Sequence, residues 1–421
     1  MKRVLLALCA PAILLLFGGC DNLLKDTVTY KINEPVFMPI GEVVAKTKVT
    51  TQAYEITGHG KICFYNDYLY LAEPDKGIHI INNSDPANPV QVGFIEIVGN
   101  HDIMIRENML YADMLTSLVW FDVSDPAHPE LKGHLEDVFH FALPETENEH
   151  GIDYEKCYNN VPQGQVVVGW RVKERKESYS KWGTDDIMYE SSSLAGSANK
   201  MSNSVNGSMS RFAIYKNYLY TVIDNKMDVF DLAGDEPSIA AQNIYVGWDV
   251  ETIFSYKDCM FMGTPFGMII FSVENPLKPE YQSSVTHVFG CDPVVVEDDI
   301  AYVTVHSGNL CGQNANDLII VDVSDTKNPR HIVTYAMTKP KGLGIDQGTL
   351  FVCDDGLKIF NAEDPQTIMA NRLAHYKGME GYDLIPYNKT LMMIAEDGIY
   401  QYDYSDLEGI RKLSKIAINA E

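Results

Sequence analysis

DLIIVDVSDTKNP, residues 317–329, is the stretch that decides the fold of this chain. It begins with an apolar run rich in Ile and Val, and it ends in Ser324-Asp325 and Pro329. β-Branched residues suit a pleated sheet, whereas Asp, Asn and Pro form turns. The stretch therefore predicts a buried β-strand that leads into a turn.

The same phrase returns along the chain. Its seven copies lie at residues 78–89, 118–129, 227–237, 268–279, 317–329, 357–366 and 399–409. A second phrase, short and apolar, precedes each copy and begins at residues 68, 109, 218, 259, 300, 350 and 391. Four of the six spacings between these starts are 41 residues, and the others are 109 and 50. A fixed period of this length indicates a repeat architecture.

Each unit divides into four short strands. In the fifth unit these are residues 293–297, 300–306, 318–323 and 331–337. Pairs such as Asp355-Gly356 and Asp397-Gly398 supply the positive φ of tight hairpins. Four strands in about 41 residues match a propeller blade, and a closed ring leaves few exposed strand edges. We therefore predict an all-β, seven-bladed β-propeller, and we prefer it to an open solenoid because neither end of the array has a polar cap.

The spacing of 109 residues marks an insertion between units two and three, at about residues 145–206. It contains one clear strand, residues 165–172 (QVVVGWRV), and a polar tract of small residues at 191–208 that is typical of a flexible loop. An eighth, degenerate blade inside the insertion is the less favoured alternative.

The first residues have the pattern of an export signal. Lys2 and Arg3 precede an apolar run at 4–17, which ends in Gly18-Gly19-Cys20. A Cys directly after small residues resembles the bacterial lipoprotein lipobox, in which Cys20 is acylated, although Phe17 replaces the usual Leu. The alternative is a cleaved, soluble secretory protein.

These patterns divide the chain into a lipoprotein signal peptide at 1–19, a lipid-anchored tether and docking segment at 20–57, and a propeller at 58–421 that carries the insertion. Residues 21–29 form the tether, and residues 30–57 are expected to dock on the first repeat. We expect the protein in the bacterial cell envelope, attached to the outer membrane through its lipid anchor.

The chain is strongly acidic. Its formal charge is −25, and loss of Lys2 and Arg3 with the leader makes it −27. Such a surface disfavours nucleic acid, which requires clustered Lys and Arg. Colloidal stability of an exported protein explains the acidity, and a cationic partner is the alternative.

One copy of the repeat points to a family. LIIVD at 318–322, preceded by a Tyr-containing strand and followed by SDxxxP, resembles the LVIVD repeat of bacterial and archaeal exported proteins. LVWFD at 118–122 and MDVFD at 227–231 are looser matches. The resemblance implies a β-propeller lipoprotein of the cell envelope, and it implies no activity.

Polar side chains are expected where the channel of the ring opens. Counting eight residues back from each start of the second phrase gives the positions at the channel mouth, which are Gly60, His101, Ser210, Glu251, Asp292, Gly342 and Asp383. The three carboxylates suit a hard cation such as Ca²⁺, and His101 suits a proton carrier. The alternative is a wet channel whose polar side chains hold no ligand.

Two cysteines belong to one face of blade five. Cys291 lies next to a mouth position, and Cys311 lies in the loop that extends this unit by nine residues. We predict a disulfide between them that closes a loop of about twenty residues and contributes about 3 kcal/mol, with two free thiols as the alternative. Cys63, Cys259 and Cys353 are expected to be buried in strands, and Cys157 has no evident partner.

A repeated aspartate follows the third strand of most units. These residues are Asp85, Asp125, Asp325, Asp364 and Asp406. We interpret them as turn caps that bond their own backbone rather than as a repeated metal site.

The sequence contains no G-x-S-x-G, H-E-x-x-H, P-loop or Rossmann fingerprint. The first hypothesis is a non-catalytic binding or scaffolding lipoprotein that presents the loop face and the insertion to a protein or glycan partner. It requires no cofactor beyond a possible Ca²⁺ ion. The rival is a propeller hydrolase or lyase that uses His101, Glu251, Asp292 and Asp383 at the channel mouth.

Overall fold

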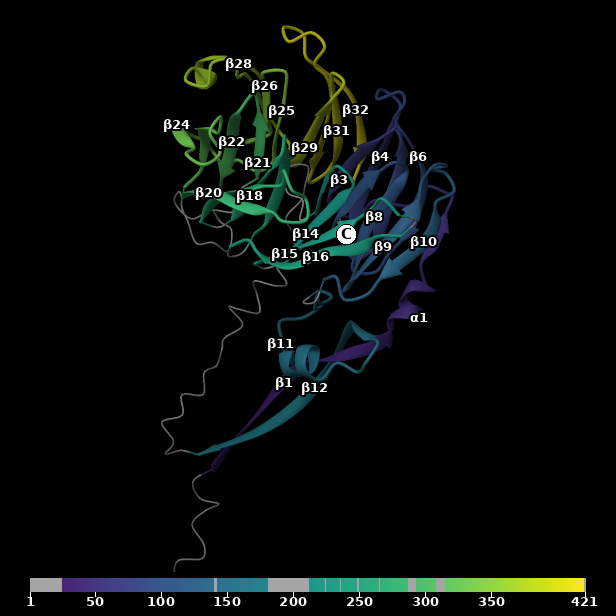
Figure 1. Cartoon of the computed structure of the whole chain (residues 1–421). Coiled ribbons are helices and arrows are strands. Elements are labelled where there is room, and N and C mark those ends of the chain that lie inside the picture. Colours follow the sequence, from purple (N-terminus) through teal and green to yellow (C-terminus); the bar gives the residue numbers. More distant parts are fainter. Residues whose placement is uncertain are drawn as a thin grey trace, which may run out of the picture.

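The computed structural model shows a ring of β-sheets from which a narrow stalk projects (Figure 1). It describes residues 25–139, 142–180, 212–223, 225–234, 236–247, 250–264, 266–286, 293–307 and 315–419. In these ranges no helix combines the length and the apolar character that a membrane span requires.

Seven antiparallel sheets form the blades; six have four strands, and the sheet of blade one has a fifth strand at its rim. Blade one contains β3 (Ile62–Tyr65), β4 (Tyr68–Glu73), β5 (Gly77–Asn82) and β6 (Val90–Glu96). Blade two contains β7 (Ile103–Arg106), β8 (Met109–Met114), β9 (Ser117–Asp122) and β10 (Glu130–Leu135). Blade three contains β13 (Phe212–Tyr215), β14 (Tyr218–Ile223), β15 (Lys226–Asp231) and β16 (Ser238–Tyr245). Blade four contains β17 (Thr252–Tyr256), β18 (Cys259–Thr264), β19 (Gly267–Ser272) and β20 (Glu280–Thr286).

The other three blades follow the same order. Blade five contains β21 (Val294–Glu297), β22 (Ile300–Val305), β23 (Asp317–Asp322) and β24 (Arg330–Ala336). Blade six contains β25 (Leu343–Asp346), β26 (Thr349–Cys353), β27 (Leu357–Asn361) and β28 (Arg372–Tyr376), with a 3₁₀ turn at Ile368–Ala370. Blade seven contains β29 (Gly381–Tyr387), β30 (Thr390–Ala395), β31 (Gly398–Asp403) and β32 (Arg411–Ala417).

The blades close into a ring. The first strand of each blade contacts the first strand of the next, and β29 of blade seven contacts β3 of blade one. The first strands therefore surround the central channel, as the sequence predicts. The prediction of a seven-bladed propeller is confirmed, and the described part of the insertion lies outside the ring instead of forming an eighth blade.

The stretch that decides the fold is β23, in the middle of blade five. Residues 318–321 are buried because β22 and β24 cover both edges of the strand and the adjacent blades cover both faces. The fourth strand, β24, contains several exposed side chains because it forms the rim. Burial on both faces explains why the third strand has an almost continuous apolar sequence.

The repeated aspartates cap turns, as predicted. The Oδ1 atom of Asp325 accepts a hydrogen bond from the backbone N–H of Lys327 at 3.0 Å. The same bond, to the N–H two residues later, is made by Asp85, Asp125, Asp364 and Asp406. These carboxylates therefore hold the loops between the third and fourth strands.

Neighbouring blades are tied together by polar side chains at the ends of the first strands. Glu297 of blade five accepts the backbone N–H groups of Gln347 at 2.9 Å and Gly348 at 2.7 Å in blade six. At the equivalent positions, Tyr65 bonds Asn108, Arg106 bonds Asn217, and Asp346 bonds Lys389 of the following blade. In these blades the hairpin of the first and second strands is thus held by the preceding blade.

Blade seven and blade one close the ring through hydrogen bonds, and each of these blades takes its four blade strands from one continuous repeat. Asn83 and Gln401, both buried, exchange two side-chain hydrogen bonds of 2.9 and 2.6 Å. The backbone N–H of Asn419 donates to the carbonyl of Ile56 at 2.9 Å. Both contacts join residues more than 300 positions apart, so the closure depends on the complete ring.

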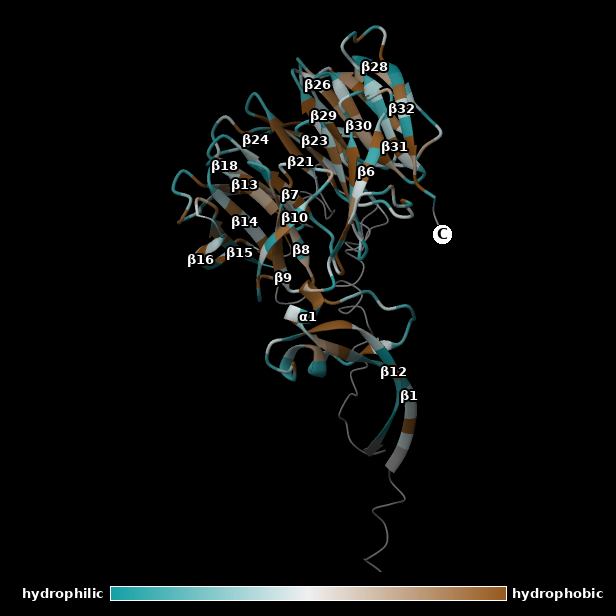
Figure 2. Cartoon of the chain, turned by 90° about the vertical axis from the view of Figure 1, so that its right-hand side faces the viewer, coloured by the Kyte–Doolittle hydropathy of each residue, from teal (hydrophilic) through white to brown (hydrophobic). Residues whose placement is uncertain are grey.

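The stalk is a separate three-stranded sheet with the order β11-β1-β12. β1 (Lys25–Pro39) pairs antiparallel with β12 (Gln165–Ser180), and β11 (Gly151–Ile152) pairs with β1 on its other edge. A π-helical turn, Glu155–Asn159, lies between β11 and β12. Figure 2 shows the sheet projecting from one end of the propeller.

The base of the stalk is packed into the propeller. The helix α1 (Ile40–Val44) follows β1, and its buried Ile40 and Val43 join one hydrophobic cluster with Val166 and with side chains of blades one and two. β2 (Lys48–Thr50) pairs with β6 at the rim of blade one. The sequence predicts docking of residues 30–57 on the first repeat; α1 and β2 dock there, whereas most of β1 pairs with the insertion. The expected tether at 21–29 overlaps the start of β1.

Candidate functional site

The candidate site lies on the face of the ring where the chain enters the first strands, which we call the mouth face. The loops between the second and third strands reach the same face. The insertion that forms part of the stalk connects β10 to β13, and so it also leaves the ring here. The stalk and the channel mouth therefore share one face.

Three of the predicted mouth residues with polar side chains lie in the described chain. Nε2 of His101 lies 3.8 Å from Oδ1 of Asp75, and its Nδ1 lies 3.7 Å from Oδ2 of Asp113. Asp383 is fully buried, and its Oδ1 accepts the N–H of Leu384 at 2.9 Å. Glu251 donates its backbone N–H to the carbonyl of Gly263 at 2.9 Å.

These three residues belong to different parts of the ring. The groups around His101 come from blades one and two, whereas Asp383 lies between blades six and seven. In the described ranges no three His, Cys, Asp or Glu side chains are grouped so that they could hold a metal ion. Ser210 and Asp292 lie outside the described residues, as do Cys20, Cys291 and Cys311, so a Ca²⁺ site and the disulfide stay predictions.

The cysteines of the described strands are packing residues. Cys353 is buried, and Cys63 and Cys259 are partly buried against hydrophobic clusters. Burial raises the pKa of Cys63 to about 11 and that of Cys157 to about 12. Their thiols are therefore neutral and weakly reactive at neutral pH.

A different group of side chains gathers on the mouth face. We call it the mouth cluster, and it comes from blades one, five, six and seven. Its members are His59, His306, Lys339, Lys341, Glu380 and Tyr382. All lie in or beside loops that enter a first strand or follow a second strand.

The centre of the mouth cluster is the ring of Tyr382. The imidazole of His59 stacks on it with 4.0 Å between ring centroids and an interplanar angle of 1°. The ammonium of Lys341 lies 4.0 Å from the same ring centroid and forms an ion pair with Glu380. Thr304 Oγ1 donates to the carbonyl of Lys341 at 2.6 Å, which ties this loop to blade five.

The environment sets the protonation of these groups. Burial lowers the pKa of His306 to about 4, with smaller contributions from the charges of Lys341 and Lys339. Burial and Lys341 also lower the pKa of His59. Burial raises the pKa of Tyr382 to about 12, helped by the charge of Glu380. At neutral pH the cluster therefore carries charge on its lysines and on Glu380.

Three of the mouth positions predicted from the sequence lie one residue after members of this cluster. The predicted positions Gly60, Gly342 and Asp383 are buried in the wall of the ring. A Cβ atom on Gly60 would lie 1.6 Å from the carbonyl oxygen of Ala72. Successive side chains of extended backbone point to opposite sides, so the residue before each of these positions (His59, Lys341 and Tyr382) can point to the opening. The sequence feature that could have located the cluster is that a His, a Lys and a Tyr occupy the same position in three repeats, one residue before the predicted mouth position.

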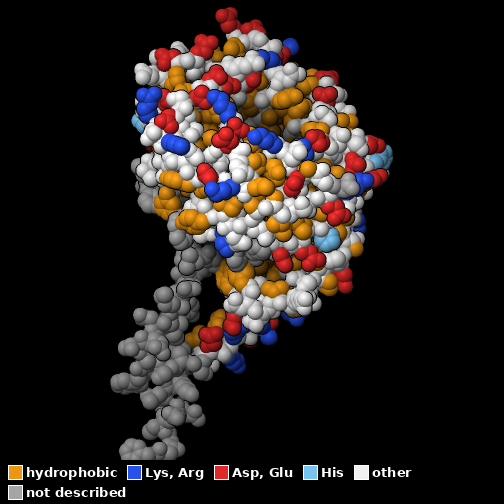
Figure 3. Space-filling model, in the orientation of Figure 1, with side chains coloured by type: hydrophobic (Ala, Val, Ile, Leu, Met, Phe, Trp, Pro, Cys, Tyr) orange, Lys and Arg blue, Asp and Glu red, His pale blue; other side chains and the backbone are white. Residues whose placement is uncertain are grey.

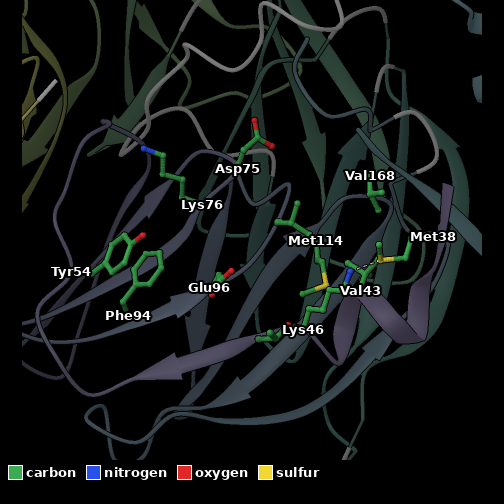
Figure 4. Close-up of a pocket in the computed structure, with 12 residues that line it drawn as sticks. Met38, Val43, Lys46, Tyr54, Asp75, Lys76, Phe94, Glu96, Met114 and Val168 are labelled. Carbon is green, nitrogen blue, oxygen red and sulfur yellow. Dashed lines mark hydrogen bonds between the residues drawn. The ribbon is translucent and has the colours of Figure 1, made fainter. Parts of the chain in front are cut away.

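The mouth face also contains a cavity of about 430 Å³ at the neck, between the stalk and blades one and two (Figure 4). We call it the neck cavity. Its apolar wall consists of Met38, Val43, Met114 and Val168, which belong to β1, α1, β8 and β12. The wall therefore exists only where the stalk meets the propeller.

The other end of the neck cavity is aromatic and polar. Tyr54, half exposed, stacks on the buried ring of Phe94 with 4.4 Å between centroids. The polar lining residues are Lys46, Thr47, Asp75, Lys76 and Glu96. Figure 4 shows Tyr54, Phe94 and Lys76 at this end, away from the apolar wall, whereas Lys46 lies beside Val43 and Met38.

A buried carboxylate supports this end of the cavity. Oε2 of Glu73 lies 2.7 Å from Nε2 of His79, and Oε1 accepts the hydroxyl of Thr57 at 2.6 Å and the ammonium of Lys76 at 3.1 Å. Gln91 donates to Nδ1 of His79 at 2.8 Å, which leaves the proton on Nε2 facing Glu73. The ring of His79 packs against Phe94, so the network fixes the aromatic wall.

The comparison with known families identifies the repeat. Residues 60–96, 100–137 and 292–337 match the LVIVD repeat, and these segments span blades one, two and five. The chain carries LVIVD repeats. The third of them contains β23, the stretch from which the fold was predicted. No curated protein matches the sequence.

One solved structure shares the fold of this chain, and two others have weaker similarity. The periplasmic gluconolactonase of Pseudomonas aeruginosa matches with 10% identity and a TM-score of 0.54, over 84% of this chain and 96% of that chain. Hsv2 of Kluyveromyces lactis has 9% identity and a TM-score of 0.48, over 86% and 99%. The computationally designed Ika8 protein has 8% identity and a TM-score of 0.49, over 87% and 88%. Only the gluconolactonase has a TM-score above 0.5, and at 10% identity the similarity concerns the fold alone.

Proposed function

We propose that this LVIVD-repeat propeller is a lipid-anchored protein of the cell envelope that binds an anionic glycan or protein partner at its channel mouth and catalyses no reaction. The observation that carries the proposal is the mouth cluster, in which side chains from four blades meet at one opening. The proposal concerns a carboxylate-bearing partner because Lys339 and Lys341 outnumber the one carboxylate of the cluster, Glu380, which leaves net positive charge there.

The charge of the cluster contrasts with that of the chain. The protein has a net charge of −25, and carboxylates are spread over the face shown in Figure 3. A local positive group on such a surface orients an acidic partner, since the surrounding carboxylates repel it elsewhere. The stacked rings of His59 and Tyr382 add apolar surface against which a sugar ring or an aromatic side chain can pack.

The pKa values support binding rather than acid–base catalysis. A general acid or base works best with a pKa near the working pH. His306, with a pKa of about 4, and Tyr382, with a pKa of about 12, keep one protonation state from about pH 5 to pH 11. These two groups therefore suit recognition by fixed hydrogen bonds rather than proton transfer.

The stalk supports the anchored arrangement. The expected acylation site, Cys20, precedes β1 by only five residues, and β1 contains 15 residues. A strand of this length extends about 50 Å. Because the base of the stalk is packed into blades one and two, the stalk would set both the distance of the propeller from the membrane and the direction of its mouth.

The anchor and the binding face are tested separately. Incorporation of labelled palmitate and sedimentation with outer membranes test the anchor, and both are expected to be lost in Cys20→Ser. For binding, the partner is captured from envelope extracts on wild-type protein, and on a Lys339→Gln/Lys341→Gln variant that is expected to lose it.

Lys257→Gln is the matched control for the binding experiment. Lys257 also pairs with a carboxylate, Asp299, and lies 5.1 Å from the ring centroid of Tyr256, but it belongs to the opposite face. Capture that is equal for the double variant and the control would contradict binding at the mouth. Turnover of a captured glycan by the wild-type protein would contradict the non-catalytic role.

A further inference from the structure

The neck cavity has the properties of a small-molecule site that is independent of the mouth cluster. Its volume of about 430 Å³ lies within the range of ligand pockets. Its wall is built by segments that are far apart in the sequence, namely β1 with α1, blade one, blade two and β12. The LVIVD repeat does not supply these stalk residues, so the cavity is a property of this chain.

Three of the five polar lining residues have protein partners. Lys76 contacts Glu73, Asp75 lies 3.8 Å from His101, and Glu96 lies 3.6 Å from the ammonium of Lys48. Lys76 and Glu96 are therefore paired with opposite charges within the protein, whereas Asp75 lies beside an imidazole. Burial raises the pKa of Asp75.

Lys46 and Thr47 differ from these three. In the described chain, the ammonium of Lys46 contacts only the sulfur of Met38, at 3.1 Å, and pairs with no carboxylate. The hydroxyl oxygen of Thr47 is buried and has no hydrogen-bond partner among the described residues. The ammonium can only donate, so a partner common to both groups is an acceptor with negative charge.

The position of these two groups relative to the apolar wall defines the shape of the ligand. Lys46 lies in the turn that follows α1, two residues after the helix ends at Val44, and Met38 contacts the Lys46 ammonium from the apolar wall. The donors therefore lie at the edge of an apolar surface that contains two methionines, Met38 and Met114. Methionine side chains adapt to irregular apolar ligands.

We propose that the neck cavity binds a small amphipathic carboxylate, whose acyl chain packs on the apolar wall and whose carboxylate accepts hydrogen bonds from Lys46 and Thr47. A charge-assisted hydrogen bond is roughly twice as strong as a neutral one, which favours the acid over the alcohol of the same length. Because the wall joins the stalk to the blades, the bound molecule also stiffens the neck.

Decanoate and decanol are suitable probes for calorimetric titration. The titrations use the exported chain with Cys20→Ser, so that neither detergent nor its own acyl group competes. We expect saturable binding of decanoate that weakens about tenfold in Lys46→Gln and several-fold in Thr47→Val, while the affinity for decanol stays within about twofold. Val168→Trp fills the cavity and is expected to abolish binding of both probes.

Two controls make the outcome decisive. Lys327→Gln removes an exposed lysine from the turn of blade five and is expected to leave both affinities unchanged. Thermal unfolding shows whether each variant is folded. If Val168→Trp does not fold, Lys46→Gln and Thr47→Val still test the proposal, because they alter only polar groups at the edge of the cavity. No saturable binding of decanoate, or equal affinity in wild type and Lys46→Gln, would overturn the proposal. Neither result affects the mouth cluster, whose test uses other residues.

Discussion

The substitution Glu73→Gln tests how much the buried carboxylate network beside the neck cavity stabilises the fold. Glu73 is 1% exposed, and burial by itself would raise its pKa. Hydrogen bonds from His79, Thr57 and Lys76 outweigh this effect and lower the pKa from 4.5 to about 2. Glutamine keeps the shape of the side chain and removes its charge.

The shift in pKa sets the expected change in stability. A decrease from 4.5 to about 2 corresponds to about 3 kcal/mol of folding free energy. Because the folded-state pKa is the lower one, this stabilisation is fully present above pH 4.5 and is lost as the pH falls from 4.5 to 2. Glu73→Gln is therefore expected to be less stable by about 3 kcal/mol at pH 7, by about 1.5 kcal/mol at pH 3, and by less than 1 kcal/mol at pH 2.

Urea denaturation followed by circular dichroism, at several pH values, measures this difference. Glu96→Gln is the control because Glu96 is exposed and its pairing with Lys48 at the surface is worth little. A constant difference between wild type and Glu73→Gln from pH 7 to pH 3 would refute the reasoning, since it would show that the ionised carboxylate is not what stabilises the network.

Three further outcomes are expected. Lys61→Met leaves Asp102 buried without its ion-pair partner, so unfolding by urea should require about 3 to 5 kcal/mol less, and Lys61→Met/Asp102→Asn should recover part of this loss. Gly60→Ala should lower the free energy of unfolding by about 3 kcal/mol or more, because the new Cβ meets a backbone carbonyl. The control is Gly41→Ala, where the Cβ has open space, and it should cost little by the same assay. Gly164→Ala is unsuitable as a control because Gly164 has a positive φ. In NMR titrations, the ring protons of His306 should remain unchanged from pH 8 to pH 5 and shift near pH 4; a midpoint near 6.5 would contradict its burial beside two lysines.

The propeller could be predicted because its pattern is local and is repeated. The apolar run of β23 and the turn cap at Asp325 each follow from a few neighbouring residues. Repetition at 41 residues then multiplies this evidence, so the blade count and the order of strands were predictable.

The mouth cluster could be predicted only in part. The repeat spacing located the loops that enter the first strands, but the offset within each loop was one residue off. A shift of one residue exchanges a buried side chain for one at the opening, as Gly342 and Lys341 show. His306 follows a second strand, and no repeated offset links it to the others.

By itself, the sequence determined the repeat, the number of blades and the role of the turn aspartates, because each depends on residues that are close together in the chain. Only the tertiary structure decided that β1 pairs with β12 and that Lys341 and His59 meet on Tyr382. These contacts join segments about 40 to 320 residues apart. Local sequence propensity cannot predict these contacts, because they depend on closure of the ring and on the path of the insertion. Both candidate sites of this protein are built from contacts of this kind.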